Sequence, residues 1–303
     1  MKKKHISIII INYNTSSLTL NCISSINAFE ESKSTEIIVV DNASKEEEVE
    51  HLINNLKNID NVTFIQSKIN LGFAAGNMLG FQYAKGDYYA FINSDVLFVE
   101  AVFESLISFM EENQNAGVCG LQIINEQGKE TTSFRPFEGI RYKLFGKKFL
   151  AFTQPKKPSM LKKYNAPIVV DFIIGSFMFF RAEAFHSIGG FDPNTFLYYE
   201  ETDVCYRLLK KGYKTYFLPN LKYIHLEGKS SSFNINLKIE HLISYLYVTR
   251  KNFGFLKYIV IKYFLILSYM LKAPFKKKNR SIFLKLLKMQ ESLALSMRHK
   301  QKI

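Results

Sequence analysis

Cysteine is scarce in this chain of 303 residues, which contains only Cys22, Cys119 and Cys205. Their scattered positions exclude a disulfide framework and a structural zinc site, and they fit a reducing compartment. Long hydrophobic runs are also lacking, because no apolar stretch reaches the roughly 18 residues that a transmembrane helix needs. With 47% apolar and 22% charged residues, the composition excludes intrinsic disorder and allows a sizeable core.

Acidic residues are almost absent from the end of the chain. Residues 251–303 contain 13 Lys and Arg and one acidic residue, Glu291, so this segment carries 12 of the 13 net positive charges. The basic character therefore belongs to a tail, and we expect no nucleic-acid partner. Aromatic and aliphatic residues interrupted by lysines precede the cluster Lys276–Lys278, which favours a helix lying in a membrane interface. A helical appendage packed on the core or on a partner chain would have the same composition.

The first half of the chain alternates short apolar runs with segments of helical spacing. The apolar runs are Ile6–Ile11, Glu36–Val40, Val62–Gln66 and Tyr88–Ile92. The helical segments are Ser16–Phe29, Glu46–Leu56 and Ala74–Ala84. This order predicts an α/β domain with a mostly parallel sheet that helices cover on both faces. The basic start of the chain imitates a signal peptide, but no cleavage site follows its apolar run, so we interpret that run as a strand.

The second half begins with a weakly patterned stretch, 126–167, that we expect to order over a ligand. A structured block follows, with the apolar run Phe172–Phe180, a glycine turn, a helix from about residue 200 to 211 and the strand Tyr213–Leu218. From about residue 239 the pattern is helical again. We therefore predict a domain over 1–235, with a nucleotide half (1–122) and an acceptor half (123–235), and a basic helical tail over 236–303.

Polar residues follow three of the predicted strands, at the sheet edge where such folds bind ligands. They are Asn12, Tyr13 and Asn14; Asp41 and Asn42; and Asn93, Ser94 and Asp95. A carboxylate such as Asp95, beside other oxygen and amide groups, suits Mg²⁺ or Mn²⁺. On spacing alone, a cap on the following helix is the simpler interpretation of Asp95.

The segment Asn70–Asn77 places two glycines, Gly72 and Gly76, at the start of a helix that follows a strand. Small residues there let backbone N–H groups approach an anionic ligand near the positive end of the helix. A tight turn without any ligand explains the same pattern equally well.

An acidic cluster opens the helix predicted from about residue 200. Its carboxylates and the aromatic residues before them are Tyr198, Tyr199, Glu200, Glu201 and Asp203. Acidic residues at a helix start favour the macrodipole, and Asp203 with Arg207 forms a helical ion pair, so a structural account is complete. A functional account is that crowded carboxylates raise one another's pKa, which helps a general base work near neutral pH. His225, after a later strand, is by itself more often structural than a ligand.

Taken in order, these segments resemble the family 2 glycosyltransferases of the GT-A fold, in particular the branch containing rhamnosyltransferases of bacterial polysaccharide synthesis. The resemblance covers about residues 5–232 and rests on the order of five motifs. They are the opening Ile-Ile-Asn-Tyr-Asn, Val40–Ser44, Asn70–Asn77, Asn93–Asp95, and the segment from Gly190 to Asp203 together with His225.

The resemblance implies an inverting enzyme that moves a sugar, with rhamnose as one candidate, from a UDP- or dTDP-linked donor to a glycan or lipid-linked acceptor. The residues that it places against the substrates are Asn12, Tyr13, Asn14, Asp41, Asn42, Asn70, Gly72, Phe73, Gly76, Asn77, Asn93, Tyr198 and Tyr199. Other functions remain open, namely a nucleotidyltransferase of similar architecture or a non-catalytic nucleotide- or nucleic-acid-binding α/β protein. The basic tail leads us to expect a cytoplasmic protein held peripherally on the inner face of the cell membrane.

For the chemistry, the resemblance implies that Asp95 holds Mg²⁺ or Mn²⁺, with His225 as a second ligand, and that Glu201 is the catalytic base. The sequence departs from the family at two of these positions. Asn93 stands where the metal motif has its first carboxylate, and Glu201 stands where the family commonly has Asp. Because the longer side chain shifts the carboxylate by about a bond length, Glu200 or Asp203 could share or take the role of the base.

Overall fold

The computed structural model describes residues 5–29, 35–137, 157–160, 162–226, 234–289, 293 and 295–300. The four strands expected in the first half are confirmed as β1 (Ile6–Asn12), β2 (Thr35–Asn42), β3 (Val62–Ser67) and β4 (Tyr88–Asn93). They pair in parallel in the order β3-β2-β1-β4. Their carboxyl ends therefore lie at one edge of the sheet.

The second half adds further strands to the same sheet. They are β5 (Val96–Phe98), β6 (Ala116–Ile124), β8 (Ile168–Val170), β10 (Phe177–Arg181) and β11 (Lys214–His225), and the full order is β3-β2-β1-β4-β10-β6-β11-β5 with β8 on β11. β10 runs antiparallel between β4 and β6. β6 and β11 therefore point in the same direction as β4 and end at the same edge.

The expected apolar run from 172 to 180 is divided between two sheets. β9 (Phe172–Ile173) pairs with β7 (Phe134–Arg135) in a small separate sheet, whereas β10 belongs to the large one. The turn between them contains Gly175. Residues 138–156 and 161 of the stretch 126–167 lie outside the described residues, so its ordering over a ligand stays a prediction.

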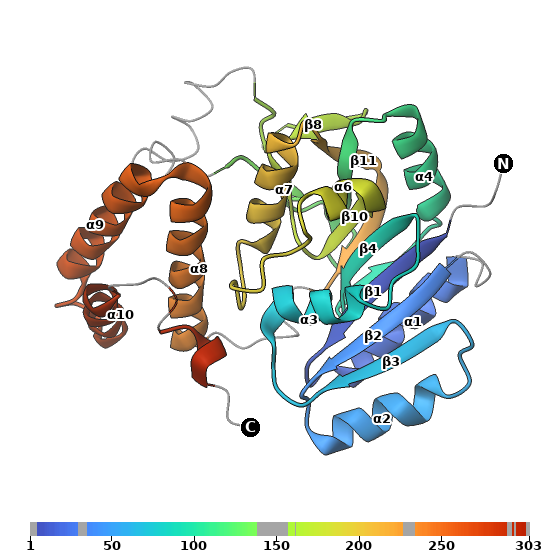
Figure 1. Ribbon diagram of the computed structural model, residues 1–303, viewed down its shortest axis with the longest axis horizontal. Helices are drawn as coiled ribbons and strands as arrows, with labels where there is room; N and C mark the ends of the chain where they lie inside the picture. Colours follow the sequence, from blue (N-terminus) through green and yellow to red (C-terminus); the bar gives the residue numbers. More distant parts are fainter. Residues whose placement is uncertain are drawn as a thin grey trace.

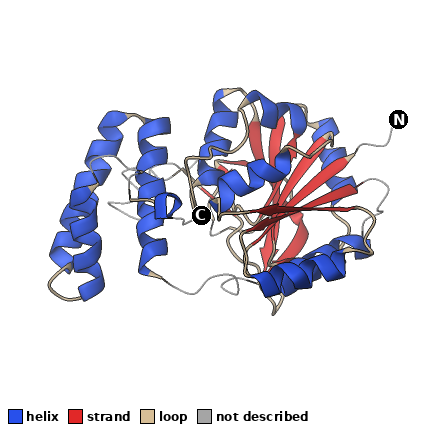
Figure 2. Cartoon of the chain, turned by 60° about the horizontal axis from the view of Figure 1, so that its bottom comes forward, coloured by secondary structure: helices blue, strands red, loops and turns tan. Residues whose placement is uncertain are grey.

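Helices cover both faces of the sheet, as the alternation predicted (Figure 2). α1 (Ser16–Phe29), α2 (Glu46–Leu56) and α4 (Phe103–Glu112) pack on one face, and α3 (Gly72–Phe81), α6 (Ala182–Ser187) and α7 (Glu200–Lys210) pack on the other. The alternation of β1 explains this arrangement, because Ile8 and Ile10 join the first core whereas Ile9 joins the second.

The tail is helical and lies beside the domain, with α8 next to α7 (Figure 1). It comprises α8 (Ile235–Phe253), α9 (Phe255–Lys272), α10 (Lys277–Lys288) and a 3₁₀ turn, η1 (Met297–Lys300). The three α-helices share their own apolar core, which Tyr199 of the domain joins. Within the described ranges, none of the helices combines the length and the apolar character that crossing a bilayer requires.

Candidate active site

Asp95 and His225 meet at the carboxyl edge of the sheet. Asp95 lies between β4 and β5, and His225, the last residue of β11, pairs with the neighbouring Val96. His225 Nε2 lies 3.2 Å from Asp95 Oδ1, and the two side chains are 13% and 3% exposed. A strand and not a helix follows Asp95, so the interpretation of this residue as a helix cap is wrong.

This pair fits a divalent cation. Two neighbouring ligands of an octahedral cation, each about 2.1 Å from it, lie about 3 Å apart, which is close to the observed separation. A carboxylate oxygen and an imidazole nitrogen together suit Mn²⁺. In the described part of the chain, no cluster of three or more His, Cys, Asp or Glu could hold a metal.

The loops after β1 and β2 are joined by buried hydrogen bonds. Asn12 Nδ2 donates to Asp41 Oδ1 (2.8 Å) and to Ser44 Oγ (3.0 Å), and the backbone N–H of Ser44 donates to Asp41 Oδ2 (3.1 Å). The side chain of Asn14 accepts a hydrogen bond from the backbone of Lys45 (2.9 Å). Because Asp41 is fully buried, the structure gives it a part in shaping the loops, and a direct contact with a nucleotide stays a prediction.

Two further observations connect these loops with the Asp95 region and with solvent. Thr15 Oγ1 lies 3.1 Å from Ser94 Oγ, so the loop after β1 adjoins the turn that contains Asp95. Tyr13 is 47% exposed at the tip of its loop. Its ring is therefore available to a planar ligand, as the base of a nucleotide would be.

Asn42 organises the turn that begins α3. Its side chain donates to Asn70 Oδ1 and to the carbonyl oxygen of Gly72 (both 3.0 Å), and it accepts from the backbone N–H of Leu71 (2.8 Å). Asn70 Oδ1 also accepts from the N–H of Gly72 (2.9 Å), and the N–H of Phe73 donates to the carbonyl oxygen of Phe196 (2.7 Å). The first N–H groups of this turn therefore have protein acceptors, which supports the interpretation as a tight turn.

The rest of the predicted glycine segment supports the same turn. A Cβ on Gly76 would meet Ile11 at 3.0 Å and Asn42 at 3.4 Å. The buried Asn77 donates from Nδ2 to the carbonyl oxygen of Phe73 (3.1 Å). The packing of α3 against β1 and β2 therefore depends on these small and polar residues.

Glu201 lies beside the turn between β9 and β10. A Cβ on Gly175 would be 3.7 Å from both Cβ and Oε2 of Glu201. The next residue, Ser176, accepts a hydrogen bond from the backbone N–H of Asn93 (2.9 Å) through its carbonyl oxygen, and its hydroxyl lies 2.7 Å from that of Tyr223. Asn93 precedes Asp95 by two residues, and Tyr223 precedes His225 by two. The turn at Gly175 therefore lies between Glu201 and the strands that carry Asp95 and His225.

The neighbouring carboxylates have different surroundings. Glu200 is 4% exposed, and its Oε1 has no hydrogen-bond partner among the described residues. Burial, followed by the nearby charge of Glu201, raises the pKa of Glu200 well above its usual value. Asp203, in contrast, accepts hydrogen bonds from Arg207 (2.8 Å), Lys251 (3.1 Å) and Asn252 (2.9 Å). Its two oxygens are therefore engaged in structural contacts.

Sequence reasoning missed two contributions to this region. The Gly175–Ser176 turn carries no distinctive motif, and only the observed strand pairing reveals its place. For the tail, a membrane surface was favoured over packing on the core or on a partner chain, yet its Tyr245 and His241 contact Tyr199, which immediately precedes the acidic cluster. Helix α8 is buried almost continuously from Ile239 to Thr249, because it packs both on the domain and on the other tail helices.

Known proteins share this arrangement of sequence and fold. The relatives include the low-salt glycan biosynthesis hexosyltransferase Agl10 of Haloferax volcanii, which is 27% identical over 68% of this chain and 62% of its own length. The rhamnosyltransferase WbbL of Escherichia coli is 25% identical over 51% of this chain and 60% of its own length. This chain thus spans about three fifths of either relative.

A shorter match, 29% identical over 28% of each chain, is to the N-acetylglucosaminyl-diphospho-decaprenol L-rhamnosyltransferase of Mycobacterium tuberculosis. Among solved structures, GalNAc-T7 with UDP, GalNAc and Mn²⁺ has a TM-score of 0.59 at 17% identity, over 80% of this chain and 48% of that one. The mannosyltransferase PcManGT of Pyrobaculum calidifontis with GDP-Man and Mn²⁺ has a TM-score of 0.57 at 13% identity, over 83% and 65%. The fold is therefore the GT-A fold.

The sequence profile described as glycosyl transferase family 2 matches residues 7–189, which is more than half of the chain. The matched segment includes β1, β2, the turn before α3, and Asp95. The chain belongs to glycosyl transferase family 2.

Proposed function

We propose that this protein transfers a sugar from a UDP- or dTDP-linked donor to a hydroxyl group of a glycan or lipid-linked acceptor, with inversion at the anomeric carbon. The observation that carries the proposal is the Asp95–His225 pair at the carboxyl edge of the sheet, with side chains 3.2 Å apart. Glu201 is supported as the base by its place beside Gly175, whose neighbour Ser176 bonds to Asn93. Rhamnose is a candidate sugar because two relatives are named as rhamnosyltransferases. A lipid-linked acceptor is a candidate because one of their names includes diphospho-decaprenol.

On the donor side, the joined loops after β1 and β2 form the nucleotide pocket, with Tyr13 against the base and Asp41 and Asn12 fixing the loops. Asp95 and His225 would hold Mg²⁺ or Mn²⁺, in keeping with the Mn²⁺ of the two structural neighbours. When bound, the cation would supply positive charge that stabilises the nucleoside diphosphate as its bond to the sugar breaks. The segment from Asn70 to Asn77 shapes this pocket without donating its first amides to the diphosphate.

On the acceptor side, Glu201 takes the proton of the attacking hydroxyl group. The acceptor oxygen forms a bond to the anomeric carbon while the bond from that carbon to the diphosphate oxygen breaks, so a single displacement inverts the configuration. Burial raises the pKa of Glu200 and so favours its neutral form. Asp203 is ion-paired with Arg207 and Lys251, so Glu201 is the carboxylate of the cluster that we propose as the base. Tyr198, beside the cluster, is placed to contact the acceptor or the transferred sugar.

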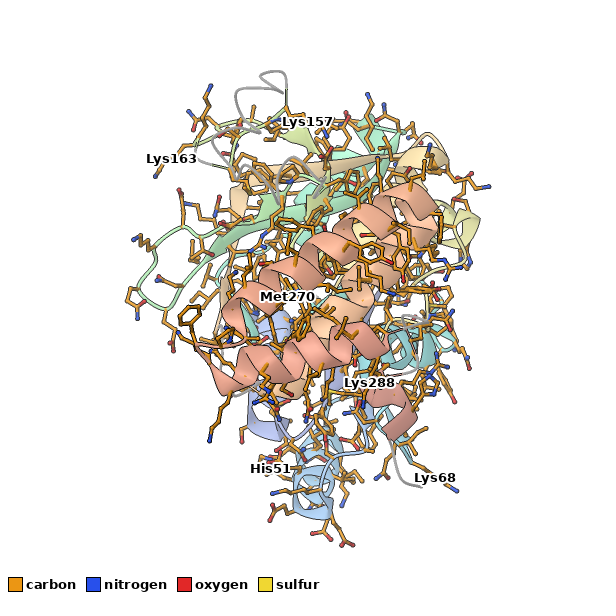
Figure 3. All side chains as sticks on the ribbon, turned by 90° about the vertical axis from the view of Figure 1, so that its left-hand side faces the viewer. His51, Lys68, Lys157, Lys163, Met270 and Lys288 are labelled. Carbon is orange, nitrogen blue, oxygen red and sulfur yellow. The ribbon has the colours of Figure 1, made fainter. Side chains whose placement is uncertain are left out.

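The tail would bring this site to the cytoplasmic face of the membrane. Helix α9 and its end expose Phe255, Leu256, Val260, Tyr263, Leu267, Met270, Leu271 and Phe275. Figure 3 faces this side of α9 and α10, with Met270 and Lys288 labelled. Exposed apolar residues beside lysines suit an anionic lipid surface. We call this set of exposed residues the outer face of the tail.

Two variants, each studied by two measurements, test the proposal. UDP- and dTDP-linked sugars are screened for thermal stabilisation with and without Mn²⁺, and transfer to a lipid-linked or soluble glycan acceptor is measured. Asp95→Ala should lose the Mn²⁺-dependent part of the stabilisation and nearly all turnover. Glu201→Gln should keep the stabilisation while its turnover falls at least about a hundredfold. Full turnover in Asp95→Ala would overturn the metal assignment, and unchanged turnover in Glu201→Gln would exclude Glu201 as the base.

A further inference from the structure

Two consecutive tyrosines immediately before the acidic cluster adopt a backbone conformation that such residues rarely have. Tyr198 has φ +77° and Tyr199 has φ +69°, both in the left-handed region. This conformation costs a residue with a side chain about 1–2 kcal/mol. It persists only where the surroundings hold it, and such strain is concentrated at functional sites. The contacts that hold these tyrosines therefore matter for the residues that follow, Glu200 and Glu201.

Helix α8 of the tail provides those contacts. The ring of Tyr199 stacks on that of Tyr245 with centroids 5.1 Å apart, and it meets the ring of His241 edge-on, also at 5.1 Å. The ring of Tyr198 lies 5.4 Å from that of His241. Ser244 Oγ donates a hydrogen bond of 2.8 Å to the carbonyl oxygen of Leu197. These three α8 residues are spaced by three and four positions, so one face of α8 covers the strained segment.

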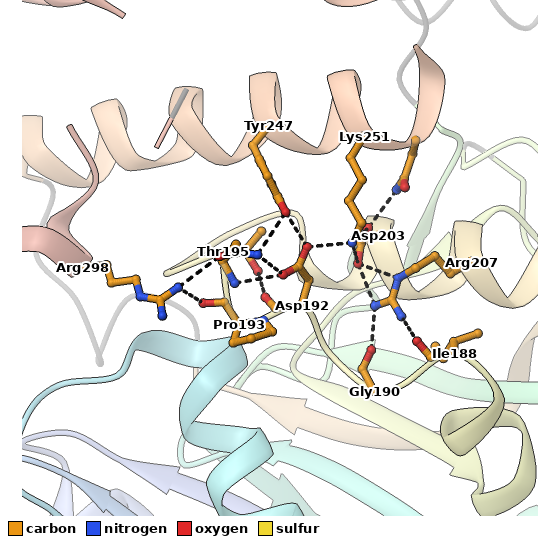
Figure 4. A network of polar contacts seen from close by, with 12 residues as sticks. Ile188, Gly190, Asp192, Pro193, Thr195, Asp203, Arg207, Tyr247, Lys251 and Arg298 are labelled. Atoms are coloured by element: carbon orange, nitrogen blue, oxygen red, sulfur yellow. Dashed lines mark hydrogen bonds and ion pairs between the residues drawn. The ribbon is translucent and has the colours of Figure 1, made fainter. Parts of the chain in front are cut away.

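The same side of α8 continues into a polar connection with α7 (Figure 4). Lys251 Nζ lies 2.9 Å from Asp203 Oδ1 and 2.7 Å from Asp192 Oδ2. Asn252 Nδ2 donates to Asp203 Oδ1 (2.9 Å), and Tyr247 donates from its hydroxyl to Asp192 Oδ2 (2.7 Å). Asp203 is buried on the first turn of α7, so α8 fixes both the start of α7 and the loop before it.

The connection joins buried groups, which makes it costly to break. The Asp203 side chain is 1% exposed and that of Asp192 is 11% exposed. Removing Lys251 would leave Asp192 with hydrogen bonds from Asn194 and Tyr247 but without the lysine cation that pairs with it, and Asp203 with Arg207 and Asn252. A buried charge that loses its ion-pair partner is strongly destabilising. The charged connection therefore sets where α8 lies, and the aromatic contacts set how it holds Tyr198 and Tyr199.

We infer that α8 is a positioning element of the active site, whose Tyr245 and His241 hold the Tyr198–Tyr199 segment in its left-handed conformation and so aim the carboxylate of Glu201. This inference rests on the proposed function for the role of Glu201. It gives the tail a part in the reaction that is separate from its outer face. Catalysis should then depend on α8 even when the acceptor is soluble and no membrane is present.

The test uses the full chain, a water-soluble acceptor and no lipid. Tyr245→Ala removes the stacked ring, Tyr245→Phe keeps it, and Tyr83→Ala is a matched control on an exposed tyrosine outside the site. We expect Tyr245→Ala to lower kcat by about tenfold to a hundredfold. Its donor KM and its Mn²⁺-dependent stabilisation by the nucleotide should stay unchanged. Tyr245→Phe and Tyr83→Ala should retain wild-type kcat.

A double variant separates this inference from the proposed function. If Tyr245 acts through Glu201, then Tyr245→Ala adds little further loss in the Glu201→Gln background. If the kcat losses of the two single variants multiply in the double variant, the two residues act independently and the positioning role is overturned. It is also overturned if Tyr245→Ala has the same kcat as Tyr83→Ala. A parallel loss of donor binding in Tyr245→Ala would also overturn it, because it would indicate general damage. If Glu201 is not the base, the single variant Glu201→Gln should instead keep the turnover of the wild type.

Discussion

Three carboxylates within four residues of one another have three different surroundings in this protein. Glu200 is buried, Glu201 lies beside Gly175 in the turn between β9 and β10, and Asp203 is held by Arg207 and by the tail. Their spacing on the helix start predicted the ion pair of Asp203 with Arg207, which the structure confirms. It could not predict the burial of Glu200 or the bonds of Asp203 to Lys251 and Asn252, because these come from other parts of the chain.

The buried Glu200 should make the stability of the protein depend on pH. Its pKa in the folded state is raised above the usual 4.5, so above pH 4.5 the unfolded chain releases a proton that the folded chain retains. The free energy of unfolding should therefore fall as the pH rises from about 4.5 towards the folded pKa, by up to about 1.4 kcal/mol per pH unit. Glu200→Gln, which stays neutral, should lack this loss.

Urea unfolding of the two proteins at pH 5, 6, 7 and 8 measures the difference. We expect Glu200→Gln to gain stability relative to the wild type as the pH increases across this series. Two curves that stay parallel would show that Glu200 titrates with an ordinary pKa. That result would also remove the reason for placing the negative charge on Glu201.

At the scale of elements, the regular parts of the fold followed from local pattern. The strands β1 to β4 and the helices α1 and α2 lie within two residues of their expected bounds, because buried parallel strands and amphipathic helices have strong periodicities. The turn before α3 was harder. Its glycines fit a ligand site and a tight turn equally well, and only the position of Phe196, more than a hundred residues later, distinguishes the two interpretations.

Gly72, at the start of α3 and close to Phe196, is therefore a position where substitution should destabilise the protein. It has φ +77°, and a Cβ there would lie 2.1 Å from the carbonyl oxygen of Phe196. Gly72→Ala should destabilise the protein by roughly 3 kcal/mol, from the left-handed conformation and from the clash between the two halves of the domain. Gly128 is the matched control, because it has φ +73° but nothing within 4 Å of its Cβ position.

Thermal and urea unfolding of both alanine variants measures the two contributions. Gly128→Ala should cost about 1 kcal/mol, since it adds only the strain of the left-handed conformation. Equal costs for the two variants would mean that the approach of Phe196 to Gly72 does not constrain the junction.

At the scale of the whole molecule, the tail has two sides with different properties. α8 contacts the domain through aromatic rings and ion pairs, whereas α9 and its end expose the outer face. The composition of the tail was compatible both with a membrane surface and with packing on the core. The structure shows why the sequence could not decide between them, because both kinds of surface are present. α8 packs on the domain, and the exposed apolar residues lie on the next helix, α9, and at its end.

The outer face should bind anionic lipid independently of catalysis. Leu256 and Leu267 are 80% and 51% exposed and lie three turns apart on α9, so they project from the same side of the helix. Replacing both with Glu removes apolar area and adds negative charge near the lysines. We expect the double variant to bind vesicles of an anionic phospholipid at least tenfold more weakly than the wild type, while turnover of a soluble acceptor stays unchanged.

Ile53→Glu is the control, because it makes the same kind of substitution, with one added charge, at an exposed apolar position of α2, far along the chain from the tail. Sedimentation with the vesicles at two salt concentrations distinguishes the lipid contact from simple charge attraction, which salt screens. The control should sediment like the wild type. If the double variant does so too, the outer face is not the membrane contact and is available to a partner protein. If the variant instead loses turnover with the soluble acceptor, the two sides of the tail are not separate in function, and the active site depends on α9 as well as on α8.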